Sequence, residues 1–256
     1  MAEVAELQRQ LLASQNPDDG WPFAKGSSWT EPTALALLAL RLHDRFAGAC
    51  QAAVHWLEQR RNADGGWRPN DAIPTSTWVT SLAILALPDA GEQAGDWLAA
   101  HAYKTTGGSC WFPGTASWVT PTATAVLALL RLGGRRFATP IEANQRFLLS
   151  RRCRDGGWNH GGTSFRSENA VSYPETTGLA LLALAGVPPE QLTAAFRLAD
   201  DFVKNPGSIE GLSWLQMGLL AQGRTVPDTA PRLQPRNVRD ISLRLLALAA
   251  LDGRTV

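Results

Sequence analysis

Hydrophobic and polar positions along the chain follow two helical patterns that take turns. One pattern has charges on one side and apolar residues at helical spacing, as at Leu7, Leu11 and Leu12, which is typical of an amphipathic surface helix. The other pattern is apolar on nearly every side, which is typical of a helix that is buried all round or lines a cavity. The alternation predicts an all-α protein in which outer helices cover inner ones.

The two patterns assign every long helix. The predicted outer helices cover residues 2–14, 47–61, 92–103, 141–152 and 189–204. The predicted inner helices cover residues 33–42, 80–87, 120–132, 176–185, 209–221 and 238–251. Residues 224–235 are rich in proline and are expected to form an irregular segment. Because the last inner helix lacks the polar face that caps an open helical repeat, we expect the inner helices to close into a ring.

A glycine-rich turn with a tryptophan follows the outer helices. Its clearest copies are Asp64-Gly65-Gly66-Trp67 and Asp155-Gly156-Gly157-Trp158. Tryptophans at 21, 67, 111 and 158 are 46, 44 and 47 residues apart, and a fixed period of this size indicates a repeat architecture. Glycine permits positive φ and aspartate accepts N–H groups at a helix start, so the turn is predicted to be a structural clasp.

This turn resembles the QxxDGxW motif of the squalene-hopene and oxidosqualene cyclases, which Gln15, Asp18 and Trp21 match. The inner-helix phrase at residues 31–40 is also similar to that superfamily, which includes the protein prenyltransferase β subunits. The resemblance extends over residues 2–251. It implies an α/α toroid, a closed ring of about six helical hairpins around an apolar cavity, formed here by residues 1–256 as a single domain.

The sequence departs from each familiar activity of that superfamily. It contains no DxDD segment, with which such cyclases protonate their substrate. Asp200-Asp201 is followed by Lys204 and does not match the DDxxD motif of metal-dependent synthases. None of the three cysteines follows an aspartate as in the zinc site of prenyltransferase β subunits. We therefore expect no metal and no cofactor.

Two columns of residues stand at the predicted starts of the inner helices. The first column contains Glu31, Thr80, Thr120, Glu175, Glu210 and Asp240. The second, two residues earlier, contains Trp29, Trp78, Trp118, Tyr173, Ser208 and Val238. Equivalent positions of a ring lie at one mouth, so acids and aromatic rings are expected together there. The candidate catalytic residues are Glu31, Glu175, Glu210 and Asp240, and the candidate substrate-binding residues are Trp29, Trp78, Trp118, Tyr173, Trp214, His160 and Arg244.

The columns have two interpretations. Acids in a first turn stabilise a helix through its dipole by about 0.3–1 kcal/mol, which would make the column structural. Alternatively, burial beside apolar walls raises a carboxyl pKa, and aromatic faces stabilise a cation by about 0.5–2 kcal/mol each, which would suit acid-initiated cyclisation. His160 precedes a long loop at residues 161–172 that could act as a lid. Arg244, a charge within an apolar helix, is expected either to hold an anion such as diphosphate or to extend outward.

Composition narrows the setting. The formal net charge is +1 with no basic block, which excludes an electrostatic footprint for nucleic acid. Three cysteines indicate free thiols in a reducing compartment, so a cytoplasmic location is expected. We expect no signal peptide, and no apolar run reaches the roughly 18–20 residues of a membrane span.

Three functions fit these observations. The first is a terpenoid cyclase-like enzyme that acts on an isoprenoid or similar apolar chain, in which a bulky residue at Ala34 or Ala83 should fill the cavity. The second is a non-catalytic toroidal binding or scaffold protein with a protein partner on its outer ring. The third is a carbohydrate-active toroid, which the apolar inner helices disfavour.

Overall fold

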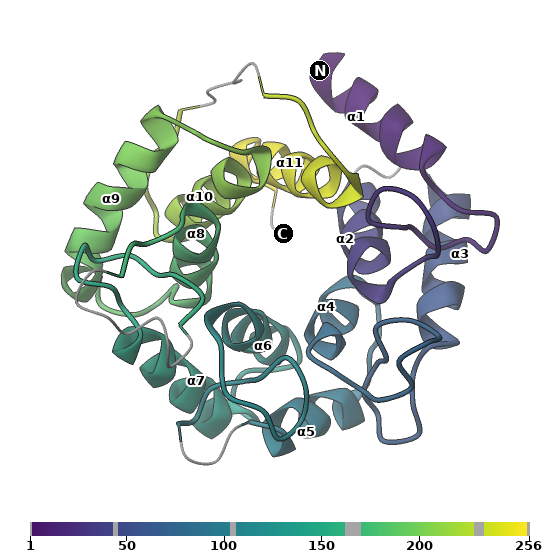
Figure 1. Ribbon diagram of the computed structural model, residues 1–256, viewed down its shortest axis with the longest axis horizontal. Coiled ribbons are helices and arrows are strands. Elements are labelled where there is room, and N and C mark those ends of the chain that lie inside the picture. The colour runs from purple at the N-terminus through teal and green to yellow at the C-terminus, as the bar shows by residue number, and fades with distance from the viewer. Residues whose placement is uncertain (1, 43–45, 103–105, 162–169, 228–232, 255–256) are drawn as a thin grey trace.

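A computed structural model describes residues 2–42, 46–102, 106–161, 170–227 and 233–254. Its helices form two concentric rings (Figure 1). The outer ring contains α1 (Ala2–Ala13), α3 (Ala47–Glu58), α5 (Glu92–Ala100), α7 (Ala138–Ser150) and α9 (Thr193–Lys204), with the short 3₁₀ helix η2 (Pro189–Leu192) before α9. The inner ring contains α2 (Thr30–Arg41), α4 (Val79–Ala86), α6 (Val119–Arg131), α8 (Pro174–Ala183), α10 (Ile209–Ala221) and α11 (Val238–Leu251).

The ring is closed, and the predicted all-α toroid is confirmed. Neighbouring inner helices pack against one another around the circle, and the last, α11, packs against both α2 and α1 (Figure 1). All the predicted outer and inner helices are present in the described residues. Of the irregular segment predicted at 224–235, residues 228–232 lie outside the described part of the chain, and the rest contains no helix.

Several inner helices begin before the expected residue. The α2 helix starts at Thr30 and α8 at Pro174, and an aromatic residue, Trp29 or Tyr173, occupies each N-cap in extended conformation. The N–H of Trp29 donates to the carbonyl of Trp21 at 2.9 Å, and that of Tyr173 to the carbonyl of Trp158 at 2.8 Å. The clasp therefore fixes where the next helix begins, which the apolar periodicity alone could not show.

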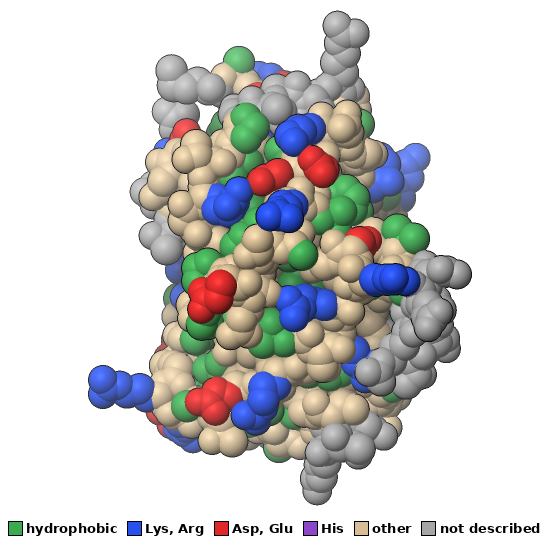
Figure 2. All heavy atoms as spheres, turned by 90° about the vertical axis from the view of Figure 1, so that its left-hand side faces the viewer, with side chains coloured by type: hydrophobic (Ala, Val, Ile, Leu, Met, Phe, Trp, Pro, Cys, Tyr) green, Lys and Arg blue, Asp and Glu red, His purple; other side chains and the backbone are tan. Residues whose placement is uncertain are grey.

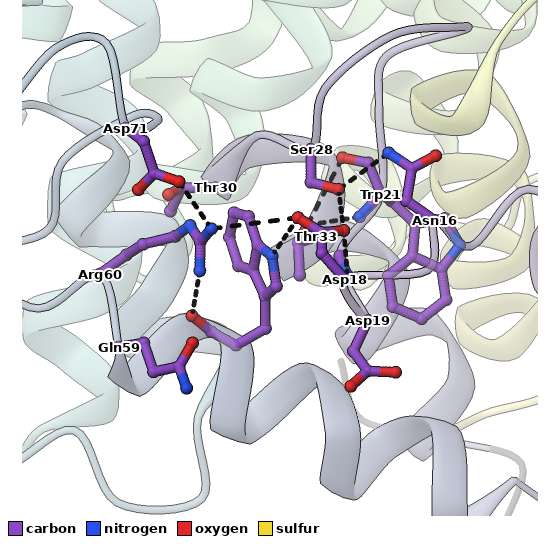
Figure 3. Close-up of polar contacts among 12 residues, drawn as sticks. Asn16, Asp18, Asp19, Trp21, Ser28, Thr30, Thr33, Gln59, Arg60 and Asp71 are labelled. Carbon is purple, nitrogen blue, oxygen red and sulfur yellow. Dashed lines mark hydrogen bonds and ion pairs between the residues drawn. The ribbon is translucent and has the colours of Figure 1, made fainter.

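The tryptophan clasp is built from buried hydrogen bonds. The indole Nε1 of Trp21 donates to the Leu11 carbonyl at 2.7 Å. The backbone N–H of Trp21 donates to Thr33 Oγ1 at 2.8 Å, and both residues are labelled in Figure 3. The same pair of bonds recurs at Trp67 and at Trp158. Each tryptophan thus joins the outer helix before it to the inner helix after it.

The aspartate of the turn reaches the next hairpin. Asp18 accepts hydrogen bonds from Ser28 Oγ at 2.7 Å and from the indole of Trp56 on α3 at 3.0 Å. Asp64 accepts the equivalent bonds from Ser76 at 2.8 Å and from Trp97 on α5 at 3.0 Å. The role of structural clasp that the sequence predicts for this motif agrees with these contacts.

One copy of the repeat has a different register from the one expected. In the third turn Ser109, not Trp111, occupies the tryptophan position, because the Ser109 N–H donates to Thr122 Oγ1 at 2.9 Å. Gly107 has φ +77°, as Gly65 and Gly156 have +91° and +97° two residues before their tryptophans. The expected alignment placed Trp111 at this position because it is the tryptophan nearest to the glycines, and this alignment is wrong by two residues.

Backbone hydrogen bonds connect successive hairpins and close the ring. At the start of an inner helix, a backbone N–H donates to a backbone carbonyl of the next repeat, two residues after the clasp residue of that repeat. The bonds run from Thr30 to the Pro69 carbonyl at 2.8 Å, from Trp78 to that of Trp111 at 3.2 Å, and from Val119 to that of His160 at 2.9 Å. The last inner helix makes the same bond to the first repeat, from Val238 to Phe23 at 2.9 Å.

Two glycines allow α8 and α10 to touch. A Cβ added at Gly178 would lie 2.3 Å from the backbone of Leu215 and Trp214, and one at Gly218 would lie 2.3 Å from the Gly178 carbonyl. Real Cβ atoms do not approach so closely, so these two backbones are in direct contact.

The outer surface carries charges of both signs. On the face seen in Figure 2, hydrophobic side chains form small areas separated by charged and polar groups. Among the described helices, none is both long enough and apolar enough to span a membrane.

Candidate functional site

The inner ring encloses a cavity of about 830 Å³. Leucines from every inner helix form its wall, and Trp214 and Met217 of α10 add a ring and a thioether. A volume of this size falls in the range of small-molecule sites, which are mostly apolar with a few polar groups. No Asp or Glu is among the described residues that line it, whereas Arg41, Arg131 and Arg254 are.

The cavity lies toward the C-terminal ends of the inner helices. Residues four and seven apart share one helix face, and four residues rise about 6 Å. Glu31 therefore shares the face of Leu35 and Leu38 on α2, and Glu210 shares that of Trp214 and Met217 on α10. Both acids lie one turn beyond the cavity wall, at the N-terminal end of the ring.

The same periodicity identifies the other residues on this inward face. They are Trp78 before α4, Thr120 on α6, Glu175 on α8 and Arg239 on α11. Of the first column, Glu31, Thr120, Glu175 and Glu210 therefore lie on the inward face. On α4 and α11 the inward residues are Trp78 and Arg239, in place of the expected Thr80 and Asp240.

Arg239 joins two of the candidate acids. Its Nε lies 3.2 Å from Glu31 Oε1, and its terminal nitrogen lies 2.8 Å from Glu210 Oε1. The Glu31 and Glu210 side chains are only 13% and 19% exposed. One cation therefore serves two mostly buried carboxylates from α2 and α10. We call Glu31, Glu210 and Arg239 the acid cluster.

Burial controls the ionisation of this cluster. Desolvation raises the pKa of Glu31, and the neighbouring Glu210 charge raises it further, while Arg239 opposes both; the net pKa lies above the ordinary value. Desolvation also raises the pKa of Glu210, with Arg239 opposing and Glu175 and Asp240 adding to the rise.

The other two candidate acids differ. Glu175 is half-buried on α8 and acts on Glu210 through its charge. Asp240 is 1% exposed, and its Oδ2 accepts from the backbone N–H and the Nε of Arg236, both at 3.0 Å. These bonds hold Asp240 at the start of α11, one residue away from the inward face.

The aromatic column is engaged in local packing at the same end. The rings of Trp78 and Trp111 pack edge to face with their centroids 4.7 Å apart. The ring centroids of Trp29 and Phe23 are 5.7 Å apart, and those of Tyr173 and His160 are 5.1 Å apart. Trp29, Trp78, Trp118 and Tyr173 are all half-buried and precede an inner helix. Of the expected binding aromatics, Trp214 is the one that lines the cavity.

His160 and Arg244 lie elsewhere. His160 is exposed, and its carbonyl accepts the inter-repeat bond from Val119. Arg244 is 2% exposed and directs its guanidinium to the outer ring, where Nε lies 2.8 Å from Glu3 of α1. It also donates to Gln216 Oε1 at 3.2 Å. Residues 162–169 of the expected lid lie outside the described part of the chain.

Sequence reasoning missed several cavity residues. Ala34 and Ala83 are fully buried in the protein core and do not line the cavity, so they were the wrong positions for a blocking substitution. Ala221 and Ala250 do line it. The sequence does not single out Arg239, because it stands beside Asp240 and only the three-dimensional register separates the two. No group of three or more metal-binding side chains occurs in the portion of the chain that the structure describes.

Comparison with known proteins gives relatives and structural neighbours. No family model matches the sequence. A drimenyl diphosphate synthase from Streptantibioticus cattleyicolor is 32% identical over 172 residues, covering 60% of this chain and 32% of that protein. A second one, from Streptomyces showdoensis, is 31% identical over 170 residues with the same coverage of both. The chain spans about a third of the length of these curated relatives.

Solved structures share the fold. A type II terpene cyclase from Scytonema in complex with its product merosterolic acid A has a TM-score of 0.66 at 14% identity, over 98% of both chains. An alpha-amylase from Clostridium perfringens has a TM-score of 0.71 at 11% identity, covering 96% of this chain and 97% of that one. Identities this low show the α/α toroid and leave the chemistry to the residues of this chain.

Proposed function

We propose that this chain forms the isoprenoid-binding ring of a terpene cyclase, in which a polyene chain is cyclised by acid-initiated carbocation chemistry. The observation that carries the proposal is the leucine-walled cavity of about 830 Å³ inside the closed ring, one helical turn from two mostly buried acids of raised pKa. The relatives named drimenyl diphosphate synthase support the same substrate class.

The reaction is an isomerisation. A protonated carboxyl donates its proton to a terminal C=C bond, which leaves a tertiary carbocation on the chain. A second C=C attacks that carbon, forming the ring bond and moving the positive charge along the chain. Loss of a proton to solvent from the carbon next to the final cation forms a new C=C bond. The donor carboxylate then regains a proton from solvent, so no atom is gained or lost overall.

The acid cluster suits the first step. Burial raises the pKa of Glu31, which increases the protonated fraction near neutral pH. Arg239 pairs with both carboxylates, and its single charge cannot fully compensate the two. Glu31 is the proposed proton donor, with the neighbouring Glu210 charge raising its pKa, Glu175 raising the pKa of Glu210, and Asp240 positioning the start of α11. These proposed roles are assigned from where each acid lies in the ring.

The walls suit the later steps. Leucines exclude water, which would otherwise trap the cation as an alcohol. Trp214 lines the cavity and presents a ring that can stabilise a passing cation by about 0.5–2 kcal/mol. Trp78 is on the same inward face at the acid end.

Product analysis tests the proposal. Purified chain is incubated with acyclic prenyl diphosphates and with the corresponding alcohols, and the products are identified by gas chromatography with mass detection. Formation of a cyclic isomer that disappears in the Glu31→Gln variant supports the proposal. Quantitative recovery of the acyclic substrates, with the protein folded, contradicts it.

The second candidate is a non-catalytic toroid that binds the same class of ligand or a protein partner on its outer ring. The observation in its favour is that the chain lacks a DxDD segment and that Arg239 neutralises part of the acid cluster. It predicts saturable binding of the polyene with no change in its structure. A partner on the outer ring would need an apolar patch, and the face in Figure 2 is mixed in character.

A further inference from the structure

The two mouths of the ring differ in charge. The N-terminal end of the inward face carries Glu31, Glu175 and Glu210 with Arg239, whereas the described charged residues that line the cavity itself are arginines alone. Arg41 is the last residue of α2 and Arg131 the last of α6, so both stand at the C-terminal mouth.

Arg41 and Arg131 converge on one place, the C-terminal end of α4. Arg41 donates to the Ala86 carbonyl at 2.6 Å from the α2 side. Arg131 donates to the Ile84 and Leu87 carbonyls at 3.0 and 2.7 Å from the α6 side. The α4 helix, with 8 residues, is short beside α2 with 12 and α6 with 13, which leaves room for both arginines above its last turn.

These two arginines donate hydrogen bonds to backbone carbonyls. Among the residues that the structure describes, neither forms an ion pair with a carboxylate. A guanidinium has five N–H donors, so each arginine keeps donors for another acceptor. The helix C-terminus favours a cation there, which explains part of the arrangement. It does not explain why two cations from different helices also face one apolar cavity.

We infer that the Arg41 and Arg131 guanidiniums bind the anionic phosphate headgroup of a prenyl ester whose apolar tail lies in the cavity. The inference rests on the proposed function and deepens it, since it orients the substrate. Guanidinium groups match phosphate oxygens in a bidentate way. The tail then runs past Leu82 and Leu85 of α4 toward Trp214, so that the end farthest from the phosphate points to the acid cluster.

This orientation agrees with the proposed chemistry. The headgroup stays bound at the arginine mouth and remains attached to the chain, because protonation begins at the opposite end. The acid end and the phosphate end are separated by the length of the inner helices, so a like-charge contact between carboxylates and phosphate is avoided. A phosphate bound beside the acid cluster would instead face the carboxylates of Glu31 and Glu210, with Glu175 nearby.

Binding measurements separate the headgroup from the tail. Farnesyl diphosphate, farnesol and inorganic diphosphate are titrated into the folded chain by calorimetry. We expect Arg131→Met and Arg41→Met each to weaken farnesyl diphosphate about tenfold or more, because each removes charge-assisted hydrogen bonds, and to leave farnesol within about twofold. Arg9→Met, on the exposed face of α1, is the control and should change neither.

Further measurements show whether the two arginines bind the headgroup or only stabilise the fold. Since Arg131 also caps α4, Arg131→Lys is measured beside it and should regain part of the farnesyl diphosphate affinity without changing farnesol. Equal loss for farnesol and farnesyl diphosphate would mean that the arginines are structural, which overturns the inference. The inference also fails if inorganic diphosphate binds as tightly as farnesyl diphosphate, because the apolar tail would then contribute nothing. It fails as well if the chain binds anionic lipid vesicles but not farnesyl diphosphate. If cyclisation proceeds and the arginine variants bind normally, the inference fails while the proposed function stands; if no prenyl compound binds, both fail.

Discussion

The backbone N–H of Val238 donates to the carbonyl oxygen of Phe23 at 2.9 Å, although the two residues lie near opposite ends of the chain. This bond repeats, at the point of closure, the bonds that join successive hairpins at Thr30, Trp78 and Val119. The ring is therefore closed by the same backbone geometry that builds it, with α11 seated between α10 and α2.

Val238→Pro tests this closure. Val238 is the first residue of α11, where proline is tolerated, and Asn237 before it is already extended at φ −161° and ψ 175°. The substitution removes the N–H and leaves the Phe23 carbonyl without its donor, so we expect a loss of about 1–3 kcal/mol in unfolding free energy. The matched control is Ile209→Pro at the first residue of α10, which also replaces a buried aliphatic side chain. Urea unfolding that shows equal losses for both variants would contradict a role of this bond in closure.

Gly178→Ala should disrupt the contact between α8 and α10. A methyl group there would meet backbone atoms of Leu215 and Trp214 at 2.3 Å, and backbone cannot move aside cheaply. We expect a loss of about 3 kcal/mol or more, or failure to fold. Gly48→Ala is the control, since α3 offers open space there and alanine favours a helix by up to about 1 kcal/mol. Thermal unfolding in which the two variants behave alike would show that the helices are not in backbone contact.

Asp64→Asn should reveal an acid-sensitive clasp. Burial opposes ionisation of Asp64, but hydrogen bonds from Ser76, the Gly66 N–H and Trp97 outweigh it, so its pKa is lowered. A lowered folded-state pKa gives stability that is present above the unfolded pKa and lost as the pH falls through the folded one. We expect the wild type to exceed the variant by about 0.5–1.5 kcal/mol at pH 7. That difference should shrink as the solution is acidified toward the lowered pKa. Asp201→Asn, on the exposed face of α9, is the control, and a pH-independent difference at Asp64 would refute the clasp's charge dependence.

Glu31→Gln should change both stability and activity. Since burial raises the folded-state pKa of Glu31, the wild type loses stability as the pH rises from the ordinary value through the raised one, and the variant should lose less over that window. If Glu31 donates the proton, cyclisation should fall by about 10²-fold or more while the binding of the acyclic substrate is kept. Glu58→Gln, on the exposed side of α3, serves as comparison and should change neither property. Retained turnover in Glu31→Gln would remove Glu31 from the mechanism.

Ala250→Trp should fill the cavity. Ala250 of α11 lines it near the arginine mouth, and an indole there takes the space of the ligand. We expect loss of isoprenoid binding with a nearly unchanged melting temperature. Ala5→Trp on the exposed face of α1 adds the same side chain outside the ring and should bind normally. Normal binding by Ala250→Trp would place the ligand elsewhere.

The sequence predicted the architecture well because each inner helix is apolar all round and the turn phrase recurs. It also placed Glu31, Glu175 and Glu210 at one mouth, since residues at equal repeat positions share a height in a ring. It could not show whether Arg239 or Asp240 faces the inside of the ring. Adjacent residues point about 100° apart on a helix, and the apolar pattern of this helix does not distinguish the two directions. It aligned Trp111 with the other clasp tryptophans, because the serine that occupies that position in the third repeat, Ser109, does not resemble a tryptophan in sequence. The partners of Arg244 and the convergence of Arg41 and Arg131 on α4 depend on contacts between distant segments, which periodicity does not encode.

The most direct test of the account is a crystal structure of the chain with a farnesyl diphosphate analogue that resists reaction. We expect density for the tail between the leucines of the inner ring, the phosphate at Arg41 and Arg131, and the distal double bond near Glu31. An inner ring filled by its own side chains, or a ligand bound outside the ring, would contradict the claim that this cavity is where the molecule works.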